Sequence, residues 1–207
     1  MMRMRVRVLA CILLLFTAIT AIAQETTLSD TFRKELRAKN EGITSIKCRF
    51  VQTREVAVLA NVVEKGGTFY FLQQGNILLA FDDGDYIKMT SELFEMKTGG
   101  SISRAKVSSN PMLKNLSSVL SACMVGDLEQ MTKGFTFGLE STDSEWVVSL
   151  VPQRGKAASK ISRIEIRFDR RDMSLNVLRM EERSGDYTMY RFEQKQFNVT
   201  IDNELFK

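Results

Sequence analysis

The chain has 207 residues with 29 basic and 25 acidic side chains, and it contains no histidine. The lack of histidine removes the commonest general base and most zinc sites, so we expect neither an enzyme nor a metal protein. Three basic residues belong to the N-terminal segment, and without them 26 basic residues face 25 acidic ones. Such a balance provides no concentrated positive surface for nucleic acid.

Residues 1–23 have the pattern of a secretory signal. Three arginines precede an apolar run from Val8 to Ala23, which ends in the cleavage pattern Ala21-Ile22-Ala23. We expect removal of residues 1–23 and a single domain formed by residues 24–207. An uncleaved membrane anchor is the alternative, although the apolar run is somewhat short for a spanning helix.

A first helix is predicted to begin at Ser29-Asp30-Thr31, since these residues are typical of a helix N-terminus. Phe32 and Leu36 follow at a four-residue spacing, and Asn40 to Gly42 end the pattern. This narrow apolar stripe is predicted to pack on a sheet. The basic outer side is interpreted as a solvated face, with a docking patch as the alternative.

Alternating apolar and polar residues predict strands through most of the remaining chain. Glycine- and aspartate-containing turns separate them, which favours antiparallel neighbours. The expected strands are 45–56, 60–72, 76–82, 85–90 and 92–97, then 135–139, 146–150, 164–168, 174–182, 187–197 and 198–201.

A second helical region opens at Asn110-Pro111, where asparagine is a suitable N-cap and proline suits the first helical position. Its wide apolar face contains Met112, Leu116, Leu120 and Met124. Gly126 ends this face, and Asp127 is placed to cap a second short helical turn. Plain core packing explains the stripe, and a movable lid is the other interpretation.

About ten or eleven strands and two helical segments predict a mainly β fold of the α+β kind. A large curved antiparallel sheet satisfies this element list as an unclosed half-barrel, with the helices lying as a lid over its concave face. Eight methionines in residues 24–207 and the phenylalanines on the strand faces favour an interior that re-packs around a flexible apolar guest. A methionine-rich core without a ligand is the alternative.

Two cysteines, Cys48 and Cys123, remain after removal of the signal. Both lie on predicted apolar faces, and a buried cysteine commonly packs as a small hydrophobic residue. Because an exported protein meets oxidising conditions, a Cys48–Cys123 disulfide is the second interpretation.

Several short motifs occur in an order that resembles the LolA family of periplasmic lipoprotein carriers. They are Phe50-Val51-Gln52, the run Glu64 to Phe71, the Asp82 to Tyr86 hairpin, the Asn110 to Leu113 helix start and the closing segment Tyr187 to Phe206. The resemblance implies a half-barrel with a helical lid that carries acylated lipoproteins. We expect the apolar groove to be lined by Phe50, Phe69, Phe71, Phe81, Phe94, Met112, Leu116, Leu120 and Met124.

The resemblance also implies a location and partners. These are the periplasm of a Gram-negative bacterium, an acylated lipoprotein or lipid cargo, an inner-membrane lipoprotein-releasing transporter and an outer-membrane acceptor. No cofactor is expected, and the chain is expected to act as a monomer. A regulatory sensor of lipoprotein or lipid on the same fold is the main alternative, and an enzyme acting on envelope lipid is a third.

One departure from the family pattern concerns a turn. LolA proteins usually have an Arg-Pro pair after the second long strand, where the arginine is implicated in gating and cargo transfer. Here the matching segment is Leu72-Gln73-Gln74-Gly75-Asn76. The departure leaves the cargo and the partner that receives it open.

Overall fold

The computed structural model of the chain describes residues 29–59, 61–73, 75–109, 119–153 and 160–207. The predicted signal at 1–23 and the predicted groove residues Met112 and Leu116 lie outside these ranges.

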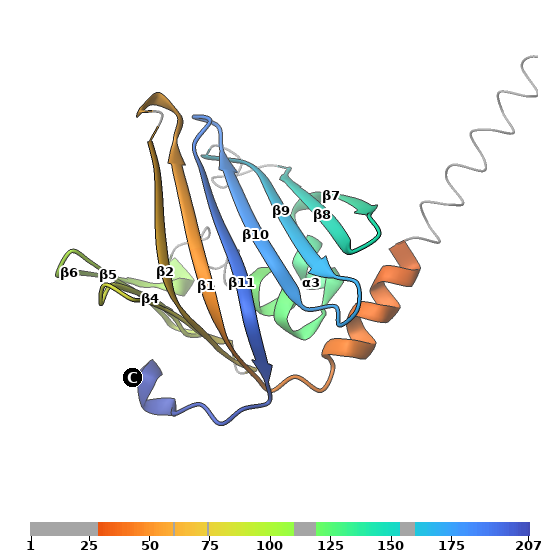
Figure 1. The fold of residues 1–207 in the computed structure, drawn as a ribbon, viewed down its shortest axis with the longest axis horizontal. Helices are drawn as coiled ribbons and strands as arrows, with labels where there is room; N and C mark the ends of the chain where they lie inside the picture. Colours follow the sequence, from red (N-terminus) through yellow and green to blue (C-terminus); the bar gives the residue numbers. More distant parts are fainter. Residues whose placement is uncertain (1–28, 60, 74, 110–118, 154–159) are drawn as a thin grey trace, which may run out of the picture.

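Eleven strands form one antiparallel sheet (Figure 1), as the fold prediction expected. The two strands at its centre, β1 and β11, are among the longest. The strands are β1 (Ser45–Val56), β2 (Asn61–Leu72), β3 (Asn76–Phe81), β4 (Tyr86–Met89), β5 (Leu93–Thr98), β6 (Ser101–Lys106), β7 (Phe135–Ser141), β8 (Glu145–Pro152), β9 (Ile161–Asp169), β10 (Leu175–Glu182) and β11 (Tyr187–Phe197).

The sheet consists of two meanders that meet in the middle. Its strand order is β6-β5-β4-β3-β2-β1-β11-β10-β9-β8-β7, so that the first and last strands of the chain are neighbours. Among the described residues, β6 and β7 each pair with one strand only, and they form the two edges of the unclosed sheet. The chain therefore has to travel from one edge to the other between β6 and β7.

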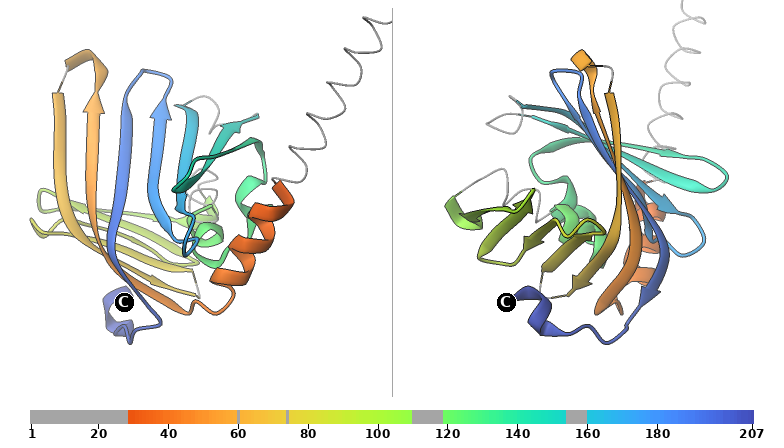
Figure 2. Two further views of the ribbon diagram at one scale, coloured as in Figure 1. Left: turned by 45° about the vertical axis from the view of Figure 1, so that its right-hand side comes forward. Right: turned by 60° about the vertical axis from the view of Figure 1, so that its left-hand side comes forward.

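After the 3₁₀ turn η2 (Val107–Ser109), two α-helical segments lie on the described part of that path. One helix covers residues 119–125, and α3 (Leu128–Thr132) follows it directly. Figure 2 shows them in the hollow of the curved sheet, with β3–β6 on one side and β7–β9 on the other. The half-barrel with helices over its concave face is thus the observed architecture.

The first helix spans residues 29–40 and packs against the same core. Phe32 and Leu36 are fully buried, and the ring of Phe32 lies 5.4 Å from Trp146 and 5.6 Å from Phe168. Asn40 ends the helix and is itself buried, because its Nδ2 atom donates to Leu36 O (2.9 Å) and Met173 O (3.2 Å). The apolar stripe was therefore interpreted correctly.

The strand predictions were wrong at two places. Residues 101–106 form β6, although its short mixed sequence gave no clear alternation; the two glycines before it, both with positive φ, make the tight hairpin turn. Residues 198–201 do not form a strand. Asn198 adopts φ 55°, and its side-chain oxygen accepts from the backbone N–H of Thr44, so the chain leaves the sheet and ends in a 3₁₀ turn, η3 (Asn203–Phe206).

Candidate functional site

The inner face of the sheet is apolar because its strands alternate. On β1, Ile46, Cys48 and Phe50 are buried, whereas Lys47 between them is exposed. The β1–β2 register places Cys48 opposite Phe69 and Ile46 opposite Phe71. Directly opposed side chains in an antiparallel pair lie on one face, so these residues form a continuous apolar surface.

Aromatic contacts extend this surface over β1, β2, β3 and β11. Phe50 packs edge-on against Phe81 of β3 at 5.1 Å between ring centroids, and it lies 6.1 Å from Tyr190 of β11. Phe69 of β2 contacts Phe192 of β11 at 5.1 Å. Edge-to-face geometry is a favoured arrangement of such rings, which makes this part of the face well packed.

Gly67 provides the space for the Phe50 ring. It lies opposite Phe50 in the β1–β2 register. A Cβ atom at this position would lie 2.4 Å from the backbone oxygen of Ala80 and 2.6 Å from the Phe50 ring. The second glycine of the run Glu64 to Phe71 is therefore a packing requirement of the site.

Helix 119–125, which we call the lid helix, covers this face. Leu120 is 5% exposed and Met124 4% exposed, and both belong to the same core cluster as Phe69 and Phe71. The helix ends at Gly126, whose φ is 75° and whose Cα is so close to the first helix that a Cβ would lie 2.6 Å from Leu36 O. The two helices thus fit closely where the lid helix ends.

The predicted groove residues fall into three groups. Phe50, Phe69, Phe71, Leu120 and Met124 are all buried in one core. Phe81 and Phe94 are partly buried and pack against that core. Met112 and Leu116 lie outside the described residues.

Sequence reasoning missed much of the lining. The same inner face includes buried side chains from β3 and β4 and from β8 to β11. The alternation within each strand predicted which face of the sheet these side chains occupy, but not which strands lie next to one another. These residues include Ile77, Leu79, Met89, Trp146, Val148, Leu150, Ile166, Leu178, Tyr190 and Phe192.

The described residues of the lid helix and the sheet enclose a small cavity. Its volume is about 10 Å³, and it is lined by residues of both helices and of β1, β2 and β11. Such a volume is at the lower limit for one water molecule. The described part of the lid helix is therefore packed against the sheet, and the two apolar surfaces are in contact with one another.

Cys48 from the sheet and Cys123 from the lid helix both line this cavity, and both are buried thiols. Burial raises the pKa of the Cys48 thiol to about 12, and it also raises the pKa of Cys123. The disulfide between them stays a prediction.

Lys195 forms a polar end of the same cavity. Its Nζ atom donates to Ser174 Oγ at 2.7 Å and to Asn176 Oδ1 at 2.5 Å, and burial lowers its pKa. The lining of the cavity is thus mainly apolar, with Asn40, Ser174 and Lys195 as its polar residues.

A larger groove flanks the lid helix on its outer side. It has a volume of about 680 Å³ and lies between the first helix and α3, with Arg33, Arg37, Val125, Leu128 and Phe137 among its lining residues. Phe137 belongs to β7, so this groove reaches the edge of the sheet.

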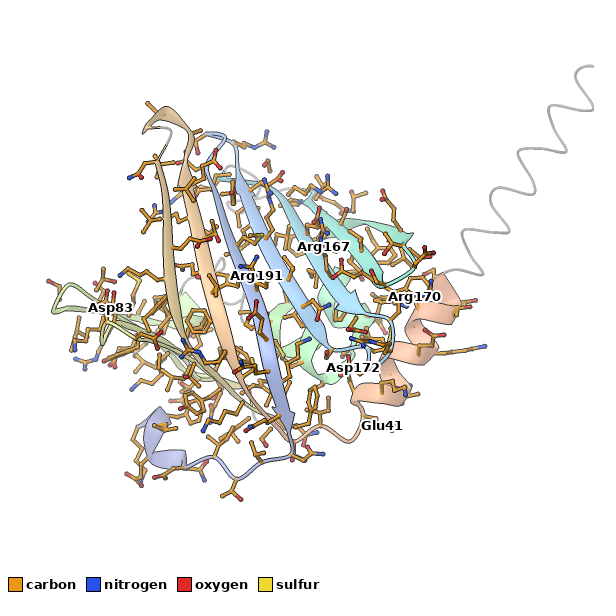
Figure 3. All side chains as sticks on the ribbon, viewed as in Figure 1. Glu41, Asp83, Arg167, Arg170, Asp172 and Arg191 are labelled. Atoms are coloured by element: carbon orange, nitrogen blue, oxygen red, sulfur yellow. The ribbon has the colours of Figure 1, made fainter. Side chains whose placement is uncertain are left out.

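The outer face of the sheet has the opposite character. Arg167 of β9 pairs with Glu165 (2.8 Å) and Glu145 (3.4 Å), and Arg191 of β11 pairs with Glu193 (3.0 Å). Figure 3 shows Arg167 and Arg191 on the outward side of the tall strands. Such exposed pairs contribute little to stability. Their charges make the outer face of the sheet polar.

A buried polar cluster lies where the short strands meet the C-terminal turn. Glu95 accepts from Tyr86 Oη at 2.6 Å and from Arg104 Nε at 2.5 Å, and Lys88 Nζ lies 3.2 Å from it. The Tyr86 and Arg104 hydrogen bonds lower the pKa of Glu95 to about 2. Lys88 also donates to Lys207 O, which attaches the end of the chain to the sheet.

Within the described ranges, no three or more histidine, cysteine, aspartate or glutamate side chains are grouped to hold a metal ion. None of the helices in the described part of the chain has the length and apolarity to cross a membrane.

The curved sheet with its apolar inner face and helical cover agrees with a match of this chain to a protein family. The model of the outer membrane lipoprotein carrier protein LolA matches residues 41–207. The chain belongs to the LolA family. A comparison with curated protein sequences finds no significant match.

Solved structures of similar shape have low sequence identity to this chain. An uncharacterized conserved protein from Thermus thermophilus is 9% identical, with TM-score 0.51 and coverage of 86% of this chain and 93% of that one. A LolA superfamily protein from Nitrosomonas europaea is 9% identical, with TM-score 0.43 and coverage of 84% and 96%. A chain of the Pseudomonas aeruginosa MucA/MucB complex is 11% identical, with TM-score 0.46 and coverage of 86% and 59%.

Proposed function

We propose that this LolA-family protein is a periplasmic carrier, which binds the acyl chains of lipoproteins between the lid helix and the inner face of the sheet. The observation that carries the proposal is that one apolar surface is shared by Phe50, Phe69 and Phe71 from the sheet and Leu120 and Met124 from the lid helix. An acyl chain that displaces the lid helix finds the same apolar surface in its place.

The closed state limits how tightly cargo is held. Burying one chain of about sixteen carbons is worth roughly 12 kcal/mol at about 0.8 kcal/mol per methylene. Three such chains held completely would exceed the ceiling of roughly 20 kcal/mol for noncovalent binding, and release would then be too slow for a carrier. Displacing Leu120 and Met124 from their buried positions opposes binding and keeps the net affinity in a reversible range.

The family membership supports the rest of the pathway. We propose that residues 1–23 direct export and that residues 24–207 act as one domain. An inner-membrane lipoprotein-releasing transporter would load the cargo, and an outer-membrane acceptor would receive it. Since Leu72 to Asn76 lacks the Arg-Pro pair, transfer by this chain does not depend on an arginine at that turn.

Mass spectrometry of molecules that co-purify with the protein tests this proposal. A carrier is expected to bring intact acylated lipoprotein and to release it unchanged to outer-membrane vesicles. Lipid whose mass changes during incubation would indicate an enzyme. Lipid-dependent capture of a signalling protein without transfer to vesicles would indicate a sensor.

A further inference from the structure

The first residues of β2 have an unpaired edge, although β2 lies in the interior of the strand order. β2 pairs with β1 along its whole length, from Asn61 to Leu72. Its pairing with β3 begins only at Gly67, opposite Phe81. In the part of the chain that the structure describes, residues 61–65 therefore have a neighbouring strand on one side only, and Figure 1 shows the β1–β2 hairpin rising past the short strands.

Two backbone amides of this edge point away from β1. The N–H of Asp82 donates to Gly66 O at 3.0 Å, so the polar groups of Gly66 face the β3 side. The β1–β2 register is regular here. Because backbone direction alternates along a strand, the N–H and C=O groups of Glu64 and Val62 face the same open side.

The edge carries two exposed apolar side chains. Val62 is 53% exposed and Val63 46% exposed. Natural proteins commonly protect sheet edges with charges, proline or bulges, because unpaired edges accept further strands. At this edge the charged Glu64 and Lys65 already have partners in Thr53 and in the turn after β3, and residues 61–63 carry no charge. Here two adjacent valines project to opposite faces, which suits an added strand that contacts both.

The occupant is set by chemistry and by position. The hydrocarbon of a bilayer cannot satisfy the outward N–H and C=O groups, so an open edge does not enter it. An extended polypeptide backbone supplies both the acceptors and the donors that these groups need. The edge also begins next to the acyl site: Phe81 packs on Phe50 at 5.1 Å, and Lys65 Nζ lies 5.7 Å from the Phe81 ring. A polypeptide joined to an acyl group beneath the lid helix therefore emerges close to this edge.

We propose that the edge from Asn61 to Lys65 binds the extended polypeptide that follows the acylated residue of a lipoprotein, as an added β-strand. This inference rests on the proposed function. Strand addition draws affinity from main-chain hydrogen bonds, so it accepts cargo of many sequences. A short contact suffices, because the acyl anchor makes it intramolecular.

The charged turn after β3 limits the lower end of the added strand. Asp82 binds the Arg49 guanidinium through both carboxylate oxygens, at 2.9 and 2.7 Å. Lys65 Nζ lies 2.7 Å from Asp83 and 3.0 Å from Asp85. These pairs hold the turn against Gly66 and Lys65, so the added strand is confined to the edge above it.

The test uses a synthetic peptide with a palmitoylated N-terminal cysteine and a flexible linker long enough to form one strand. Hydrogen exchange followed by NMR is expected to show new protection at the Val62 and Glu64 amides when this lipopeptide binds. Glu64→Pro removes one outward N–H, as an edge strand tolerates, and is expected to weaken lipopeptide binding about 3- to 10-fold. The matched control is Glu64→Ala, which also loses the hydrogen bond to Thr53 but keeps the amide, and it is expected to bind as the wild type.

Palmitoyl-cysteine without a linker separates the two proposals. If it binds without protecting Val62 and Glu64, and the lipopeptide protects them, the inference is supported. If both ligands bind and neither protects these amides, the added strand is refuted while the carrier function stands. If neither ligand binds, the carrier function fails and the inference falls with it. Protection that rises with protein concentration in the absence of ligand would identify a second copy as the occupant and overturn the proposal.

Discussion

Leu120→Ala is the substitution that separates a lid from ordinary core. The side chain is 5% exposed and lies in the cluster that contains Phe69 and Phe71. The adjoining cavity is only about 10 Å³, so the side chain is tightly packed. Its removal leaves a cavity that the neighbouring residues fill only in part. Leu→Ala changes in such cores cost about 2 to 5 kcal/mol.

The carrier mechanism that we propose assigns this loss of free energy to the closure of the lid helix over the sheet. If the lid helix opens locally, the apparent affinity for an acyl chain is the intrinsic affinity multiplied by the fraction of open protein. Weakening closure by about 2 kcal/mol raises that fraction, and with it the affinity, by about 30-fold while the open form remains the minor one. Leu120→Ala is therefore expected to bind an acyl probe more tightly and to release it more slowly.

The assay is a titration with a fluorescent fatty acid, combined with chemical denaturation. Leu78→Ala is the matched control, because Leu78 of β3 is 7% exposed but lies outside the cluster that contains Leu120. The control is expected to lose global stability without a gain in affinity. An ordinary loss of stability in Leu120→Ala, with unchanged probe affinity, would falsify the lid reasoning and make this helix plain core.

Three further changes test the packing and electrostatics of the site. Gly67→Ala should lower the free energy of unfolding by about 1 to 3 kcal/mol, because the added Cβ meets Ala80 O and the Phe50 ring; Gly138→Ala in β7, where the nearest atom is 3.7 Å away, is the control without a clash in denaturant melts. Glu95 has its pKa lowered to about 2, so its contribution to stability is complete above its ordinary value of 4.5 and is lost as the pH falls from there towards 2; Tyr86→Phe should raise that pKa in a carboxyl NMR titration, and an unchanged pKa would contradict the assigned hydrogen bond. Because burial raises the pKa of Cys48 to about 12, a thiol reagent at mildly alkaline pH should label it only after denaturation; fast labelling of the folded protein would refute this, and no labelling after denaturation without reductant would show the disulfide.

The sheet was predictable because its strands alternate clearly. Phe50 on β1 and Phe69 and Phe71 on β2 lie where the alternation places them, inside. The short strand β6 was missed because its sequence, with Arg104 and Lys106 and every residue exposed or half-exposed, has no buried face. Conversely, 198–201 alternates like a strand, but the positive φ of Asn198 and its bonds to the start of β1 end the sheet.

The candidate site was less predictable than the fold. Periodicity assigns a face to each side chain, but it does not say which strands are neighbours. The pairing of β1 with β11 brings Tyr190 and Phe192 beside Phe50 and Phe69, although the two pairs come from opposite halves of the sequence. Such long-range register depends on the whole sheet, so the aromatic cluster was visible only in the structure.

The lid helix and the open edge of β2 have the same structural origin. A closed barrel has no edges, and its interior is filled or enclosed permanently. In the described part of this chain, β6 and β7 do not pair, and the lid helix lies over the concave face on the path between them. The pairing of the short strand β3 with β2 stops at Gly67, so residues 61–65 of β2 have no partner strand on that side in the described chain. Leaving the barrel unclosed thus places a helix over an apolar surface and, beside it, the backbone edge that we propose binds the polypeptide attached to the cargo.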